Sequence, residues 1–113
     1  MRRIVYAGTA FYTGDALAEA VMEYARALAR HGIADTVFVP GRTLQGDRDR
    51  IEVLLGPASQ IVSEPVDLDG AEIEDAGLVS RLGAKTAELA PHKPTAEPAG
   101  TGTDAPESFE DLG

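Results

Sequence analysis

Apolar and polar residues alternate with several different spacings along this 113-residue chain, and the most regular stretch runs from Thr13 to Gly32. Large apolar side chains recur there every three or four positions, at Leu17, Val21, Tyr24 and Leu28. This spacing places them on one face of a helix, with charged residues on the other face. The stretch therefore predicts an amphipathic helix that buries one face against a sheet.

Both ends of this predicted helix carry capping signals. Thr13 is expected to be the N-cap, because its hydroxyl can accept a hydrogen bond from an amide of the first turn. Tyr12 would then pack against Leu17 as a hydrophobic staple. Gly32 is expected to end the helix in the left-handed conformation.

Two runs rich in β-branched and aromatic residues flank the helix and predict strands. Arg3 to Ala7 forms the first run. Residues 8–12 are expected to connect this strand directly to the helix, so that the two elements are neighbours in space. Ile33 to Val39 forms the second run, and Pro40-Gly41 is expected to end it.

The polar segment that follows predicts a hairpin. Gly46 can adopt a positive φ at the turn, and Ile51 to Leu55 supplies the returning strand. Gln60 to Val66 predicts an edge strand, because Pro65 has no amide hydrogen for a central ladder.

Mixed charge surrounds the hairpin turn. Its basic members are Arg42, Arg48 and Arg50, and its acidic members are Asp47 and Asp49. A solvated loop explains this composition most simply, and a cation-lined anion site is the alternative.

A second helix is expected to begin at Asp69, because Asp69 and Glu72 have the spacing of a capping box. Gly77 and Gly83 each cost about 1 kcal/mol relative to alanine inside a helix. The sequence therefore leaves open whether residues 70–89 form one continuous helix or a helix that breaks near Gly83.

From Ala90 onward the chain is rich in Pro, Gly, Thr and acidic residues, with one lysine against five carboxylates. Such a composition predicts a disordered acidic tail over 90–113, after a folded domain over 1–89. An inert solvating tail explains this segment most simply, and the alternative is that Phe109 and Leu112, three residues apart, form a helical turn that docks on a basic partner.

These elements together predict an α+β fold. Its sheet is small and mostly antiparallel, with three to four strands, and one main helix packs on it. The expected order along the chain is strand, helix, two strands, an additional edge strand and a second helix. So small a core predicts marginal stability unless a partner covers part of the sheet.

Composition excludes several classes of function. A net charge of −9 argues against binding nucleic acid or an anionic membrane surface. The chain has no cysteine and two histidines, so no disulfide, thiolate nucleophile or metal site is expected. No export signal or membrane span is evident, which predicts a cytoplasmic protein. No cofactor is expected.

The glycines beside the start of the first helix are explained most simply by a tight turn with a helix cap, and a small-ligand site at Gly8, Thr9, Thr13 and Gly14 is the alternative. Glycine lets backbone amides approach an anion at a helix N-terminus. The spacing does not match a Walker loop, and Asp15 places negative charge where a phosphate would bind.

Ser59 and Gln60 form a second candidate, because they follow Gly56-Pro57 at the end of a predicted strand. A nucleophilic serine would need a neighbouring base, and the sequence identifies none, so no catalytic residue is assigned. Carboxylates between residues 62 and 76 lack the spacing of a calcium loop, so no metal ligand is assigned either.

The sequence thus favours a non-catalytic protein-interaction module whose partner is a second copy of itself or another protein. The alternative is a small-ligand binder for a phosphate-like or nucleotide-like group, or a minor enzyme. That function would use the loops around Gly8-Gly14 and Gly56-Gln60.

Overall fold

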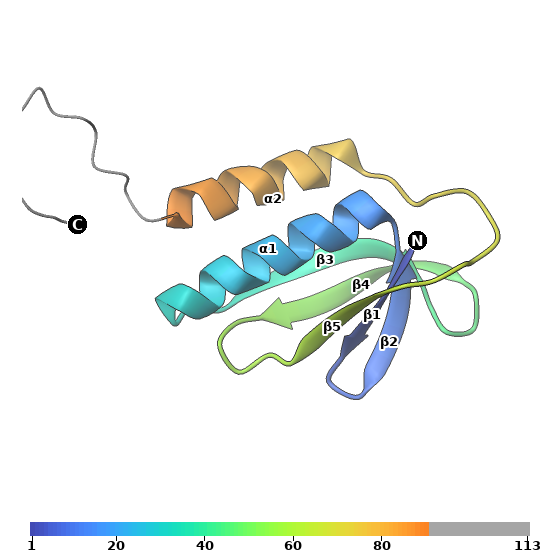
Figure 1. Ribbon diagram of the computed structural model, residues 1–113, viewed down its shortest axis with the longest axis horizontal. Helices are drawn as coiled ribbons and strands as arrows, with labels where there is room; N and C mark the ends of the chain where they lie inside the picture. Colours follow the sequence, from blue (N-terminus) through green and yellow to red (C-terminus); the bar gives the residue numbers. More distant parts are fainter. Residues whose placement is uncertain (91–113) are drawn as a thin grey trace, which may run out of the picture.

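The computed structural model describes residues 1–90, which form an α+β fold with a five-stranded antiparallel sheet and two helices (Figure 1). The elements in chain order are β1 (Arg2–Tyr6), β2 (Thr9–Thr13), α1 (Asp15–His31), β3 (Asp35–Arg42), β4 (Arg48–Leu55), β5 (Ile61–Pro65) and α2 (Ala76–Leu89). The strands lie in the order β4-β3-β2-β1-β5. The fold class agrees with the prediction, and the sheet has one strand more than expected.

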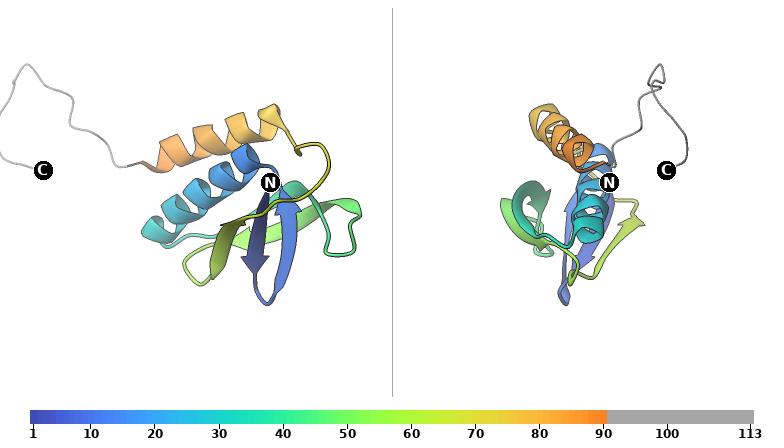
Figure 2. Two further views of the ribbon diagram at one scale, coloured as in Figure 1. Left: turned by 45° about the vertical axis from the view of Figure 1, so that its right-hand side comes forward. Right: turned by 90° about the vertical axis from the view of Figure 1, so that its left-hand side faces the viewer.

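The apolar face of α1 is the centre of the core. Leu17, Val21, Tyr24 and Leu28 are all at most 4% exposed, as the periodicity predicts. The strands contribute the facing side chains, which are Ile4, Phe11, Val37, Val39, Val53 and Leu55. Figure 2 shows α1 lying between the β3–β4 hairpin and the other three strands.

The predicted connection over residues 8–12 is wrong, because residues 9–12 belong to β2 and Gly8 to the turn before it. Ala7 and Gly8 both have positive φ, 51° and 81°, and form a two-residue turn between β1 and β2. Such turns favour Asn-Gly, and a left-handed alanine is uncommon, so the Ala7-Gly8 pair gave no turn signal in the sequence.

The predicted N-cap is also wrong, because Thr13 ends β2 and Gly14 caps α1. The Thr13 hydroxyl is buried and donates to the carbonyl of Pro40 at 2.8 Å. Tyr12 lies in β2 opposite Arg42 instead of forming a staple. At the other end Gly32 caps α1 with φ 66°, as predicted.

A carboxylate from a distant segment completes the start of α1. The Asp15 amide donates to Glu72 Oε2 at 2.6 Å, and the Met1 amino group lies 2.9 Å from Asp15 and 3.1 Å from Glu72. The predicted capping box therefore does not form, because Glu72 caps α1 instead of a helix of its own. Asp75 caps α2 by accepting from the Leu78 amide at 3.0 Å.

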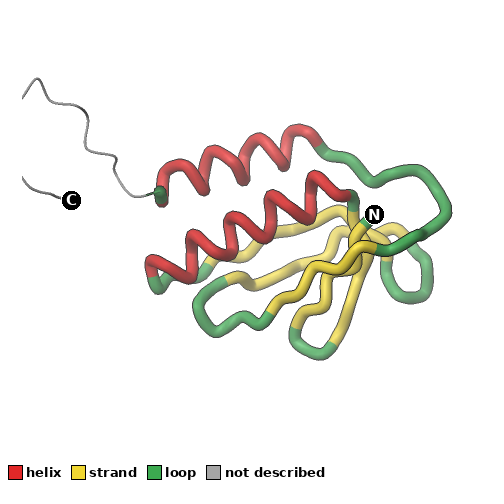
Figure 3. Tube along the Cα trace, in the orientation of Figure 1, coloured by secondary structure: helices red, strands yellow, loops and turns green. Residues whose placement is uncertain are grey.

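The second helix is continuous through both of its glycines. It begins at Ala76, seven residues after the predicted start, and passes Gly77 and Gly83 without a break. It packs along α1, which supplies the tertiary contacts that offset the low helix propensity of glycine (Figure 3). The tail predicted over 90–113 lies almost wholly outside the described residues.

The sheet is nearly split between β2 and β3, which pair at one position, Tyr12 with Arg42. β3 continues to Arg42, beyond the predicted end at Pro40-Gly41. A Cβ at Gly41 would lie 2.7 Å from the Tyr12 carbonyl oxygen, so glycine permits the close approach of the two strands. Beyond this corner the β3–β4 hairpin turns away from the other strands.

A short link then joins the two edges of the curled sheet. β4 and β5 lie at opposite edges, yet residues 56–60 connect them. The Tyr6 hydroxyl stabilises this closure, because it donates to the Leu54 carbonyl at 2.6 Å and accepts from the Leu54 amide at 3.1 Å. β5 is an edge strand, as the position of Pro65 predicts.

Replacing Gly14 by alanine is expected to destabilise the fold. The added Cβ would lie 1.8 Å from the Ile73 carbonyl oxygen, so the segment that caps α1 must move. We expect the free energy of unfolding to fall by about 1–3 kcal/mol, measured by urea denaturation. Gly83→Ala is the matched control, because its Cβ meets nothing within 4 Å and should add up to about 1 kcal/mol. Equal effects of the two substitutions would contradict the described packing at Gly14.

Replacing Tyr6 by phenylalanine is expected to loosen the end of β4. The Leu54 amide loses its partner, so it should exchange its hydrogen faster, and stability should fall by about 1 kcal/mol. Ser59→Ala is the control, because the Leu54 carbonyl keeps its bond to Tyr6 when the Ser59 hydroxyl is removed. A Leu54 amide equally protected in both variants would refute the bridging role of Tyr6.

Candidate functional site

The structure divides the predicted ligand-binding residues into two groups. Gly8, Ser59 and Gln60 line one hollow of about 500 Å³ at the closure of the sheet. Thr9 is exposed beside it at the start of β2. Thr13 and Gly14 lie at the opposite end of β2, roughly 13 Å away for four residue steps along a strand.

Apolar groups dominate the hollow. Leu54 and Val62 are 53% and 52% exposed at its wall, and no charged residue among residues 1–90 lines it. The Ser59 hydroxyl donates to the Leu54 carbonyl at 2.8 Å, and Tyr6 is bound to the same residue. The polar groups of the hollow are thus largely engaged in holding the fold.

The second group surrounds the start of α1, where the backbone is already covered. Thr13 is fully buried, and the Ile73 carbonyl lies directly over Gly14. The Asp15 amide, which an anion would contact, is bound to the Glu72 carboxylate. Within residues 1–90, no cluster of three or more acidic or histidine side chains is placed to hold a metal ion.

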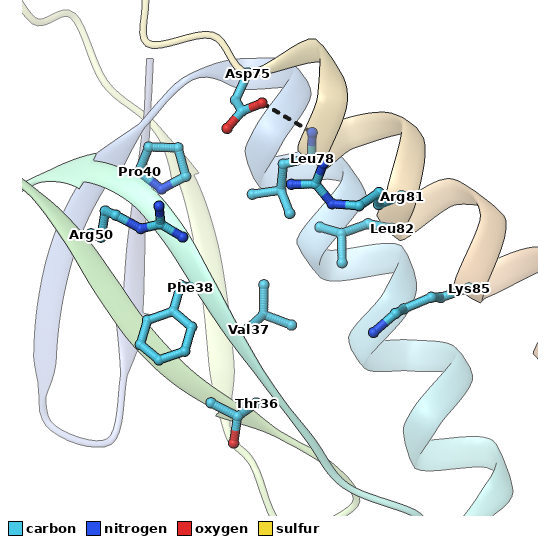
Figure 4. A pocket seen from close by; sticks show the side chains of 10 residues that line it. All are labelled: Thr36, Val37, Phe38, Pro40, Arg50, Asp75, Leu78, Arg81, Leu82 and Lys85. Carbon is cyan, nitrogen blue, oxygen red and sulfur yellow. Dashed lines mark hydrogen bonds between the residues drawn. The ribbon is translucent and has the colours of Figure 1, made fainter.

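A different concave surface lies between β3 and α2, and we call it the β3–α2 groove (Figure 4). Its volume is about 260 Å³. The lining residues are Thr36, Val37, Phe38 and Pro40 from β3, Arg50 from β4, Asp75 before α2, and Leu78, Arg81, Leu82 and Lys85 from α2.

Positive charge is concentrated in this groove although the whole chain is acidic. Three cations line it, Arg50, Arg81 and Lys85, against one carboxylate, Asp75. Asp75 is occupied by its capping bond to α2. Arg50 lies over the ring of Phe38 with its guanidinium carbon 5.9 Å from the ring centre. The groove thus combines an exposed aromatic ring with cations that project from both of its walls.

The register of the β3–β4 hairpin determines where the backbone of β3 points. Both backbone polar groups of Leu54 bind the Tyr6 hydroxyl, so they point away from β3. Its partner Thr36 must therefore be at a position that does not hydrogen-bond to β4. Because this orientation repeats every two residues, Phe38 and Pro40 also direct their backbone groups away from β4. The bond from Thr13 to the Pro40 carbonyl agrees with this assignment.

The edge of β3 is consequently open within the described part of the chain. β2 pairs with β3 only at Arg42, so no strand among residues 1–90 covers the stretch from Thr36 to Pro40 on that side. The amide and carbonyl of Phe38 therefore point away from β4, and no strand among residues 1–90 pairs with them. Such an edge is a template for another extended segment.

A polar cluster holds one end of the groove in place. The Tyr24 hydroxyl donates to Asp35 at 2.5 Å, and Lys85 Nζ lies 3.4 Å from the same carboxylate. Burial raises the pKa of Tyr24 to about 12, with the Asp35 bond acting in the same direction. That bond in turn lowers the pKa of Asp35 below its usual range. The cluster joins α1, β3 and α2, so the groove has a fixed wall.

Only part of this groove was predicted from the sequence. Arg50 belonged to the mixed-charge segment for which an anion site was the alternative interpretation. Arg81 and Lys85 were not predicted, although their four-residue spacing puts both on one face of α2. The edge of β3 could not be found without knowing the strand order. Phe109 and Leu112, the predicted docking residues, lie outside the described residues.

No helix within residues 1–90 has the length and apolar character needed to traverse a bilayer. Comparison of the chain with protein-family models, with characterised proteins and with solved structures finds no match.

Proposed function

We propose that this chain is a non-catalytic protein-interaction module that binds an extended acidic segment of a partner protein in the β3–α2 groove. The observation that carries the proposal is the open edge of β3 beside Arg50, Arg81 and Lys85. A segment added to this edge would exchange backbone hydrogen bonds with Phe38, while its acidic side chains meet Arg50 and Arg81. Lys85 is already paired with Asp35.

The size of the groove favours a peptide segment over a compact small molecule. Its volume of about 260 Å³ is below the roughly 300–1,000 Å³ typical of small-molecule sites. An extended segment can lie along the groove and continue beyond both ends. The interface would be small, so the interaction should be weak and transient, with an affinity in the micromolar to millimolar range.

The side-chain chemistry supports binding without catalysis. His31 is the one histidine among residues 1–90, and its Nε2 lies 2.5 Å from the carbonyl of Leu89. Ser59 donates its hydroxyl to a backbone carbonyl, away from any base. Neither side chain lines the β3–α2 groove. In this proposal, recognition uses the strand edge of the groove and its charged side chains.

A synthetic peptide of alternating Glu and Val tests this proposal. We expect its addition to the full chain to shift the amide resonances of Phe38, Leu78 and Arg81 in a heteronuclear NMR titration. Arg50→Gln and Arg81→Gln should each weaken binding about two- to fivefold, as expected for loss of one exposed charge pair. Binding should also weaken with added salt.

The matched control is Arg48→Gln, which removes the same charge from β4 outside the groove and should leave the affinity unchanged. A peptide of alternating Lys and Val should not bind. The proposal is excluded if the acidic peptide shifts no groove amide at millimolar concentration, or if Arg48→Gln weakens binding as much as Arg50→Gln.

A second candidate function is the binding of a small ligand in the hollow at the sheet closure. Its support is that Gly8, Ser59 and Gln60, from two loops distant in sequence, line the same hollow of about 500 Å³. That volume lies within the usual range for small-molecule sites.

Thermal denaturation with a panel of nucleotides, sugar phosphates and uncharged apolar ligands tests this candidate. A specific ligand at 100 times its dissociation constant should add about 2.7 kcal/mol of stability. Substituting Gly8 by valine should abolish that gain. A panel without any stabilising compound argues against a ligand in the hollow.

A further inference from the structure

The residues that follow the described part of the chain have the chemistry complementary to the β3–α2 groove. Between residues 104 and 112, four acidic side chains accompany two large apolar ones. These residues are Asp104, Glu107, Phe109, Glu110, Asp111 and Leu112. No basic residue follows Lys93. The groove presents the opposite charges beside apolar side chains.

We propose that residues 104–112 of the same molecule bind the β3–α2 groove and compete there with the partner's segment. This inference rests on the proposed function, because it requires the groove to accept an acidic segment. The chain would then regulate its own binding site, since a partner must displace residues 104–112 before it reaches the edge of β3.

The length of the intervening chain permits this contact. α2 ends at Leu89, about one turn beyond Lys85, which lines the groove. Residues 90–103 then separate the helix from the acidic segment. Fourteen residues reach at most about 45 Å when extended. The groove from Lys85 back to Asp75 covers roughly 15 Å of helix, so the segment can lie along its whole length.

Attachment to the same chain compensates for a weak intrinsic affinity. A short tether gives an effective concentration on the order of 1 mM. A segment with an intrinsic dissociation constant near 1 mM would therefore occupy the groove about half of the time. An intrinsic dissociation constant near 1 mM is therefore all that the exposed cations of the groove have to provide.

The local charge favours this segment despite the net charge of the chain. Three carboxylates adjoin the groove. Asp75 is engaged with the Leu78 amide and Asp35 with Tyr24 and Lys85. Glu52, opposite Phe38 in the hairpin, is exposed beside Arg50, so its charge opposes an acidic segment at that end. Figure 4 shows the Arg50 and Arg81 side chains at the groove, and among residues 1–90 neither guanidinium forms a salt bridge. Salt screens charges more strongly at larger separations. It therefore weakens the repulsion between the acidic segment and distant carboxylates of the chain more than the attraction to the nearby cations.

The test compares the full chain with a full-length variant in which the segment is neutral. That variant carries Asp104→Asn, Glu107→Gln, Glu110→Gln and Asp111→Asn. We expect the groove amides of Phe38, Leu78 and Arg81 to shift in the variant without added peptide. We also expect the variant to bind the Glu-Val peptide about two- to fivefold more tightly, because the internal competitor is lost.

Two further full-length variants separate specific binding from a general charge effect. Phe109→Ala with Leu112→Ala keeps the charge and should also tighten peptide binding. A fourfold neutralisation at Glu19, Glu23, Asp47 and Asp67, outside the groove, changes the charge equally and should leave both readouts unchanged.

Three outcomes would overturn the inference. Unchanged groove amides with unchanged peptide affinity would exclude residues 104–112 as the occupant and leave the groove proposal standing. A groove that binds the peptide in none of the variants would remove both proposals. Shifts that depend on protein concentration between about 20 µM and 1 mM would assign the contact to a second copy of the chain.

Discussion

Burial of one face of α1 is the constraint on which the rest of this structure depends. The four large side chains of that face need apolar partners on two sides, and a flat sheet would cover only one. The sheet instead bends around the helix at the Tyr12–Arg42 corner, so that the β3–β4 hairpin and the remaining strands both contact α1 (Figure 2). The hydroxyl of Tyr6 holds the two parts together at the far end.

This bend has a direct consequence for the proposed function. Because β2 and β3 separate beyond their corner, the inner part of β3 loses a strand neighbour on one side. α2 lies along that side but contributes side chains instead of a backbone ladder. Exposed strand edges are usually protected by charge or covered by another element. Under the proposed function, the cations beside the edge discourage unspecific pairing and favour an acidic segment.

The sequence predicted those elements whose signals are local. The spacing of Leu17, Val21 and Leu28 was sufficient for α1, and Gly32 correctly marked its end. The N-cap prediction for Thr13 was wrong because its hydroxyl donates to a distant carbonyl, that of Pro40. The capping-box prediction for Glu72 was wrong for the same reason, since its carboxylate accepts from the Asp15 amide, 57 positions earlier in the sequence, and so caps α1. A side chain that satisfies either a local or a remote partner cannot be assigned from spacing alone.

The β3–α2 groove was beyond prediction because it depends on strand order. Arg50 and Arg81 come from separate elements, and only the curled sheet brings them to one surface. The orientation of the Phe38 backbone depends on the hairpin register, which Leu54 and Tyr6 determine. Knowledge of the elements without their pairing would not have identified an open edge.

Hydrogen-bond scalar couplings across the β3–β4 hairpin test the central claim most directly. The register predicts couplings from the Val37 amide to the Val53 carbonyl and from the Val39 amide to the Ile51 carbonyl. It predicts no coupling between the Phe38 amide and any carbonyl of β4. A measured coupling from the Phe38 amide to the Glu52 carbonyl would show that this amide points into the hairpin and would contradict the account.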